Sequence, residues 1–150
     1  MKAHVDLASR GRYQHPMRIV GRVLAFANLM LLRKMAGAGW SCAAVAQYNL
    51  GLMYANGRGV PKDDAEAVKW LRKAAEKGVD ESQYNLGLMY ANGRGVPKDD
   101  ATAYQWYLLA VAQGNEEARK GMDDMEKLLT PEQRAEGQRM AREFKAKESK

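Results

Sequence analysis

Apolar residues recur every three or four positions along most of the chain after residue 45, which is the spacing of amphipathic α-helices. The first of these stripes lies in residues 46–56 and consists of Ala46, Leu50, Gly51 and Tyr54. Because these positions fall on one side of a helix, the stripe predicts a helix with one buried face and one exposed face.

A second apolar stripe follows after a short segment that cannot continue the helix. Gly57 suits the left-handed conformation that ends a helix, and Pro61 lacks the amide hydrogen that a helix interior needs. Asp63 or Asp64 can then cap a second helix, which stops at Gly78. The inward residues of this helix are Ala67, Trp70, Leu71, Ala74 and Ala75. The two stripes together predict a helix–turn–helix hairpin.

The whole hairpin recurs with a period of 36 residues. Residues 47–65 are repeated letter for letter as residues 83–101, and Trp70 recurs as Trp106, so both tryptophans are expected in the core. A fixed period between about 20 and 50 residues is typical of stacked units, none of which buries its own apolar face alone. We therefore expect hairpins that pack side by side.

The pattern weakens toward the C-terminus. A third stripe, formed by Ala118, Met122 and Met125, begins near Glu116, but Asp123 replaces the helix glycine of the earlier units. A last helix is then predicted from a capping box, in which Thr130 is the N-cap, Pro131 begins the first turn and Gln133 pairs with the cap. We interpret it as a capping helix, because the end of a stack of repeats needs a polar outer face. Its apolar side consists of Gly137, Met140, Ala141 and Phe144.

Written out from Ala46 to Gly78, the unit reads A-x-x-x-L-G-x-x-Y-x-x-G-x-G-V-x-x-D, followed by A-x-x-W-x-x-x-A-A-x-x-G. This pattern resembles the Sel-1-like repeat family, which is related to the tetratricopeptide repeats of about 34 residues. The match runs as far as Ala118. The departures from the pattern, which affect packing at most, are Ser82, Val111 and Asp123.

The resemblance implies an all-α fold, a right-handed αα-hairpin solenoid with a C-terminal capping helix. It also implies a bacterial adaptor or scaffold that binds a protein or peptide and has no catalytic residues and no cofactor. One branch of the family is cysteine-rich and has been linked to β-lactam binding, and the single Cys42 places this chain outside that branch. Two alternatives remain open: an envelope-associated enzyme or peptidoglycan- or β-lactam-interacting protein, and a self-associating structural repeat protein that is a monomer or weak homodimer.

On this basis the chain divides into five parts. They are a basic tail (1–18), a degenerate helix or signal-like segment (19–45), a first repeat (46–81), a second repeat (82–117), and an incomplete repeat with the capping helix (118–150).

The segment 19–45 admits two interpretations. The stretch LRKMAGAG, residues 32–39, aligns with LRKAAEKG, residues 71–78. This alignment predicts that the segment is the degenerate second helix of a hairpin. Alternatively, residues 17–38 act as a signal peptide, which would make the protein periplasmic or secreted. Arg33 and Lys34 lie where a cleavage region is normally uncharged, so we favour the helix and a cytoplasmic protein. The ten residues before Arg33, all apolar except Asn28, are too few to span a bilayer, which needs about 20.

Composition narrows the range of partners. The length and the 46% of hydrophobic residues suit one domain with its own core. The net charge of +6 lies entirely in residues 1–45, whereas residues 46–150 hold 17 basic and 17 acidic residues. A repeat region with balanced charge lacks the basic face that binds phosphates, so we expect no nucleic-acid partner. The lone Cys42 excludes an internal disulfide and is interpreted as a small hydrophobic residue.

Few residues suggest a catalytic, metal-binding or phosphate-binding site. The repeated Gly-Arg-Gly-Val-Pro-Lys-Asp-Asp lacks the Lys-Ser/Thr pair of a phosphate-binding loop and the strand that precedes one, so we interpret it as a turn. The Asp pairs at 63–64 and 99–100 are interpreted as helix caps rather than calcium or acid–base sites. His4 and His15 stand in no pattern with a nucleophile or carboxylate, so we expect no catalytic or metal site.

The exposed side of the first helix in each repeat is the best candidate for a binding surface. Its residues are uncharged and include an aromatic residue, a leucine and two amides in each copy. Two such rows on adjacent repeats would form a mildly apolar surface on the concave side, suited to an extended peptide or a helix. Asn at a helix end can instead be only a cap, and Tyr48 can shield the next hairpin. The candidate partner-binding residues are Tyr48, Asn49, Leu52, Asn56, Tyr84, Asn85, Leu88 and Asn92.

Overall fold

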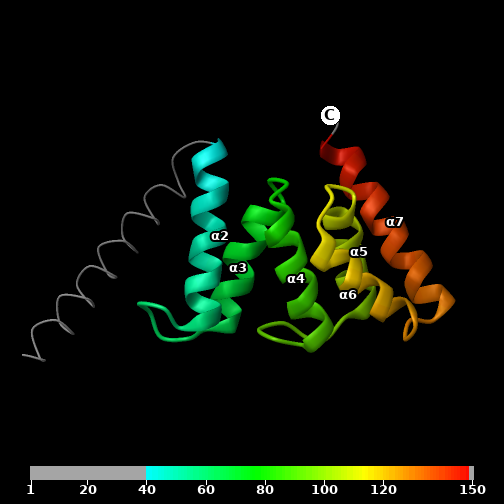
Figure 1. Cartoon of the computed structure of the whole chain (residues 1–150), viewed down its shortest axis with the longest axis horizontal. Coiled ribbons are helices and arrows are strands. Elements are labelled where there is room, and N and C mark those ends of the chain that lie inside the picture. Colours follow the sequence, from blue (N-terminus) through cyan, green and yellow to red (C-terminus); the bar gives the residue numbers. More distant parts are fainter. Residues whose placement is uncertain (1–39, 149–150) are drawn as a thin grey trace, which may run out of the picture.

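The computed structural model describes residues 40–148, and the side chains of residues 43–148. Within this range the chain forms six α-helices and no strand, which confirms the all-α prediction. The helices are α2 (Trp40–Asn56), α3 (Asp64–Ala75), α4 (Asp80–Asn92), α5 (Asp100–Val111), α6 (Glu116–Glu126) and α7 (Pro131–Glu148). The helices lie side by side along the long axis of the molecule, from α2 at one end to α7 at the other (Figure 1). The alternative interpretations of residues 1–39 lie outside the described residues.

The helices pair as the repeated stripes predict. Helices α2 and α3 form one hairpin, α4 and α5 form the next, and α3 packs against α4 to join them. Leu50, Leu71 and Leu86 are almost completely buried at the centre of this stack. The first helix begins at Trp40, earlier than residue 46, because Ala43 is also buried and extends the inward stripe by one turn. The core is therefore shared between hairpins, as expected for a repeat protein.

Side chains cap the helices at the positions that the sequence indicates. The Asp63 carboxylate accepts the amide hydrogen of Glu66, and Asp99 accepts that of Thr102, each at 3.0 Å. At the start of α7, Gln133 N donates to Thr130 Oγ1 over 3.2 Å, and Thr130 N donates to Gln133 Oε1 over 3.0 Å. These contacts satisfy amide hydrogens that have no partner inside the helix, so the starts of α3, α5 and α7 are defined locally.

The second Asp of the first pair, Asp64, joins the two repeats. The guanidinium of Arg94, in the turn of the second repeat, binds the Asp64 carboxylate at the start of α3 over 2.8 Å. The hydrogen bond from Arg94 lowers the pKa of Asp64 below its usual value. Gly95 follows in the left-handed conformation, with φ of +67°. A Cβ atom on Gly95 would lie 2.2 Å from the Asp64 carbonyl oxygen, so this close approach between repeats requires glycine.

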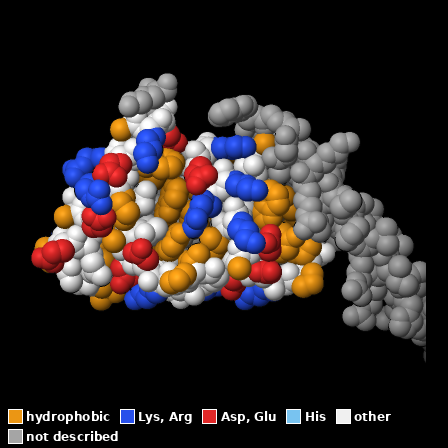
Figure 2. All heavy atoms as spheres, turned by 180° about the vertical axis from the view of Figure 1, so that it is seen from behind, with side chains coloured by type: hydrophobic (Ala, Val, Ile, Leu, Met, Phe, Trp, Pro, Cys, Tyr) orange, Lys and Arg blue, Asp and Glu red, His pale blue; other side chains and the backbone are white. Residues whose placement is uncertain are grey.

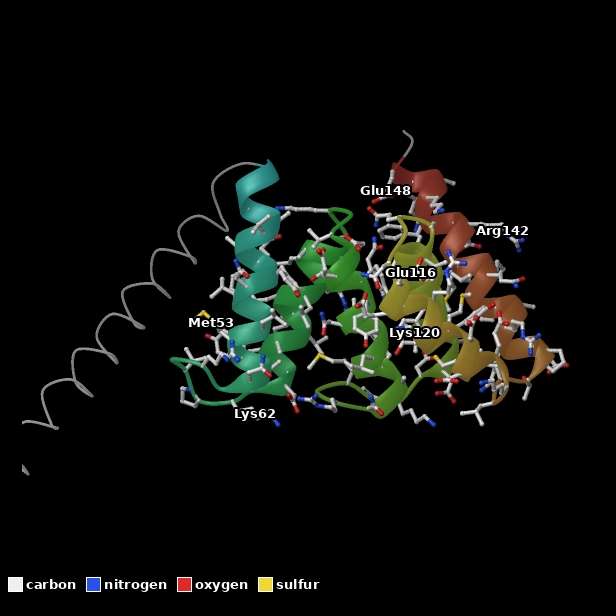
Figure 3. All side chains as sticks on the ribbon, viewed as in Figure 1. Met53, Lys62, Glu116, Lys120, Arg142 and Glu148 are labelled. Atoms are coloured by element: carbon white, nitrogen blue, oxygen red, sulfur yellow. The ribbon has the colours of Figure 1, made fainter. Side chains whose placement is uncertain are left out.

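The last helix, α7, packs on α5 rather than forming a hairpin with α6. Gly137 lies against the first turn of α5, where an added Cβ would come within 2.8 Å of the Ala101 carbonyl oxygen. Farther along, the ring of Phe144 packs edge-on against Trp106, with centroids 5.4 Å apart. Arg142 extends from the outer side of α7 (Figure 3). Helix α7 therefore covers the end of the second repeat with a charged outer surface, as predicted for a capping helix.

Identical residues in the two copies have different surroundings. Trp106 is 6% exposed beneath Phe144, whereas its counterpart Trp70 is only half-buried, with Lys73 Nζ 4.3 Å from its ring centroid. Met89 is buried between the repeats, whereas Met53 is half-buried at the outer edge of α2 (Figure 3). The expectation that both tryptophans fill the core therefore holds fully only for Trp106.

The burial of Tyr107 can be tested through the pH dependence of stability. Burial, with a smaller effect of Tyr84, raises the pKa of Tyr107 from 10.0 to about 12. The folded state holds the phenol proton more tightly than the unfolded state, so this contribution to stability is complete below pH 10 and is lost as the pH approaches 12. We expect Tyr107→Phe to weaken the alkaline loss of stability in urea unfolding followed by circular dichroism. Tyr84→Phe keeps Tyr107 and is the control, and identical pH profiles for wild type and Tyr107→Phe would contradict this account.

Candidate protein-binding surface

The candidate residues on α2 and α4 form two rows that we call the amide strip: Tyr48, Asn49, Leu52, Asn56, Tyr84, Asn85, Leu88 and Asn92. Asn49, Asn56 and Asn92 are exposed, and the other members of the strip are half-buried. None of its members carries a formal charge. The strip is therefore accessible to a ligand, and its leucines and tyrosines have surface left to bury.

Tyr48 connects the two rows of the amide strip. Its ring packs against the main core cluster, and its hydroxyl lies near Glu81 and Asn85 of α4. Burial is the main cause that raises the pKa of Tyr48, and the Glu81 carboxylate raises it further. Tyr48 therefore shields part of the next hairpin and also holds the rows of α2 and α4 beside each other.

The second row is partly engaged with its own repeat. Asn85 Nδ2 donates to the Glu81 carbonyl over 2.7 Å, and Asn92 Nδ2 donates to the Leu88 carbonyl over 2.9 Å. The ring of Tyr84 lies 6.0 Å from that of Tyr107. Since an amide side chain has two N–H donors and an acceptor oxygen, the exposed Asn92 keeps capacity for a ligand backbone.

Sequence reasoning missed one member of this face. Val45 on α2 is 56% exposed and lies one turn before Asn49 on the same side of the helix. Val45 lies just before the repeat boundary that the sequence pattern predicts at residue 46, but the helical spacing that places Asn49 and Leu52 outward also applies to it. The corresponding residue of α4 is Glu81, so charge enters this face only at the start of the second row.

The third helix of this type, α6, presents a different surface. A shift of 36 residues places Lys120 and Asp124 of α6 where Tyr84 and Leu88 stand on α4. Both replacements are exposed, and the labels in Figure 3 place Lys120 on α6 below Glu116. The uncharged surface is thus confined to the two complete repeats.

The other candidate residues have structural partners or lie outside the described range. The glycine-rich segments are turns between helices, in which Gly57 and Gly93 have φ of +66° and +63°. Within the described residues, no three or more His, Cys, Asp or Glu side chains gather as metal ligands. No described helix combines the length and the apolar character needed to cross a membrane. His4 and His15, and the side chain of Cys42, lie outside what the structure describes.

Comparison with known proteins agrees with the helical hairpins. The family model described as Sel1 repeat matches residues 44–79 and 80–115. Sel1 repeats are generally protein–protein interaction modules. A search of curated proteins finds no match.

Solved structures with the same fold extend the comparison. A protective antigen present in uropathogenic Escherichia coli strains, which displays an SLR fold, is 30% identical over 80% of this chain, with a TM-score of 0.66. A Sel1 repeat protein from Oxalobacter formigenes is 38% identical over 64% of the chain, with a TM-score of 0.60. The Helicobacter pylori cysteine rich protein B is 28% identical over 51% of this chain and 58% of its own, with a TM-score of 0.50.

The chain spans less than a third of the first two of these proteins, covering 29% and 27% of their lengths. What it shares with them is therefore the stack of repeats. The two matched repeats, the glycine turns between the helices and the shared core together show that residues 44–115 of this chain are two Sel1 repeats.

Proposed function

We propose that this protein is a non-catalytic binding module that holds a peptide or helix of another protein on the amide strip. The observation that carries the proposal is the pairing of accessible, uncharged rows on α2 and α4. Half-buried Leu52 and Leu88 occupy the same place in the two rows, and the exposed Val45 extends the first. An apolar surface of this kind usually marks a contact site.

The chemistry of the strip suits an extended peptide or one face of a helix. Leucine side chains can bury apolar residues of the ligand, and exposed amides such as Asn49 and Asn92 can pair with its backbone. Tyr48 keeps the two rows side by side, so a ligand can touch both repeats at once. The charged side chains of α6, Lys120 and Asp124, then limit the surface at one end.

The double variant Leu52→Glu with Leu88→Glu tests the proposal. We expect it to lose capture of the partner, because two carboxylates would have to be desolvated on binding, while helicity and melting temperature stay near wild type. Capture is measured by affinity purification from cells of the native host, followed by mass spectrometry. The matched control is Leu128→Glu, because Leu128 is 84% exposed and lies outside the strip. Unfolding of the double variant would show that the leucines belong to the core, and unchanged capture would show that the ligand binds elsewhere.

A further inference from the structure

A second surface of the molecule is a shallow groove along α3. It has a volume of about 460 Å³ and lies between α3 and the turn of the second repeat. Its floor is formed by Ala65 and Val68 of α3 and by Val96 of the turn, and the Gly95–Asp64 contact closes one end. Its rim carries Lys69, Arg72, Lys73 and Glu76. In the view from behind, Lys and Arg side chains lie between apolar strips at the place of α3 (Figure 2).

The second repeat shows which kind of element can pack on this face of a hairpin. A shift of 36 residues converts Ala65 and Val68 of the groove into Ala101 and Tyr104 of α5. Gly137 of α7 lies against both of these residues. A Cβ atom added to Gly137 would be 2.8 Å from the Ala101 carbonyl oxygen and 2.9 Å from Cδ1 of Tyr104. The chain thus packs a helix on this face of α5, whereas on α3 only the turn with Gly95 and Val96 lies there, and Ala65 stays exposed.

Charge distinguishes the open groove from the occupied one. The shift that relates the repeats places neutral residues on α5 where α3 has cations: Gln105 for Lys69, Leu108 for Arg72 and Leu109 for Lys73. Helix α7 therefore packs on a neutral surface, whereas the occupant of the α3 groove would meet a basic rim. A ligand of complementary charge is favoured there, especially in its rate of association.

The cations differ in how far they are neutralised inside the chain. Lys69 is paired with Glu66 at 2.5 Å. Arg72 donates to the Tyr90 hydroxyl, and Lys73 lies over the Trp70 ring. Within the described residues, neither Arg72 nor Lys73 has a carboxylate at salt-bridge distance. These two charges can be paired by a ligand without breaking an ion pair of the protein.

We infer that the α3 groove binds an acidic amphipathic helix of a partner protein. One apolar side chain of that helix rests on Ala65 and Val96, above the buried Val68, and its carboxylates pair with Arg72 and Lys73. The end of the groove near Glu76 rejects an acid, which sets the orientation of the ligand. This site is separate from the amide strip, so the protein would hold two partner segments on different faces.

The probe for this site is a synthetic amphipathic peptide with one leucine anchor and a row of glutamates, and its isostere has glutamine at every glutamate. Titration is followed by fluorescence anisotropy and by NMR of labelled valine methyl groups. We expect the acidic peptide to shift the Val68 and Val96 signals and to bind about tenfold tighter than its isostere, with an advantage that falls as salt rises. Equal binding of the two peptides, absence of saturable binding, or shifts confined to α2 and α4 would each overturn the inference.

The variant Arg72→Glu with Lys73→Glu keeps the fold, because both side chains are exposed. It should bind the acidic peptide about tenfold more weakly and bind a lysine-bearing version of the peptide better than wild type does. The matched control is Lys120→Glu with Lys147→Glu, which changes the net charge equally but lies on α6 and α7. Equal weakening in both variants would assign the effect to net charge and reject the groove. Leu52→Glu with Leu88→Glu should leave this binding unchanged, so failure of one site is distinguishable from failure of the other.

Discussion

Gly95→Ala is expected to lower the free energy of unfolding by about 3 to 5 kcal/mol, the largest loss that we predict for one methyl group. Two costs add at this position. The residue has φ of +67°, which disfavours any Cβ atom, and that atom would lie 2.2 Å from the Asp64 carbonyl oxygen. The turn would have to move away from α3 and pull Arg94 from Asp64, so the joint between the repeats would weaken.

The matched control for this prediction is Gly114→Ala. Gly114 also has a positive φ, +91°, but an added Cβ would meet no atom within 4 Å. It should therefore show only the conformational cost, about 1 to 2 kcal/mol. Both free energies come from urea unfolding monitored by circular dichroism. Equal losses in the two variants would show that the close approach of Gly95 to α3 contributes nothing to stability.

Gly137→Ala is expected to lower the free energy of unfolding by about 2 kcal/mol, although alanine is the better helix former by roughly 1 kcal/mol. The added Cβ would lie 2.8 Å from the Ala101 carbonyl oxygen and 2.9 Å from Tyr104, so α7 would have to lift from α5. Phe144 would then lose part of its contact with Trp106. Hydrogen exchange should therefore accelerate mostly in the amides of α7.

Gly121→Ala is the matched control, since it makes the same change inside α6. There the nearest atom to an added Cβ is the end of the Tyr107 ring at 3.2 Å, which can shift slightly. We expect a change within about 1 kcal/mol of zero, because the gain in helix propensity offsets the tighter contact. A more stable Gly137→Ala protein with unchanged exchange in α7 would contradict the packing of this helix on α5.

The candidate surfaces differ in how far the sequence could reveal them. The amide strip follows from helical spacing alone, because residues three or four apart share a helix face. Val45 obeys the same rule and was missed only through the choice of the repeat boundary. The α3 groove could not be found in this way. Its wall combines Val68 with Val96, which come from different repeats and meet only when the hairpins stack.

The hairpins follow from local features of the chain: the apolar spacing, the caps at Asp63 and Asp99 and the glycine turns all act within a few residues. The surroundings of each copy of a repeated residue depend instead on how the hairpins stack. Met53 and Met89 have identical neighbours in sequence, yet Met89 is buried and Met53 half-buried, because within the described residues only Met89 lies between two hairpins. Likewise, α7 lies on α5, whereas the corresponding face of α3 meets only the turn of the second repeat, which leaves a shallow groove. The physical reason is that burial depends on which surface is adjacent in space, and contacts between residues far apart in the chain leave no local pattern.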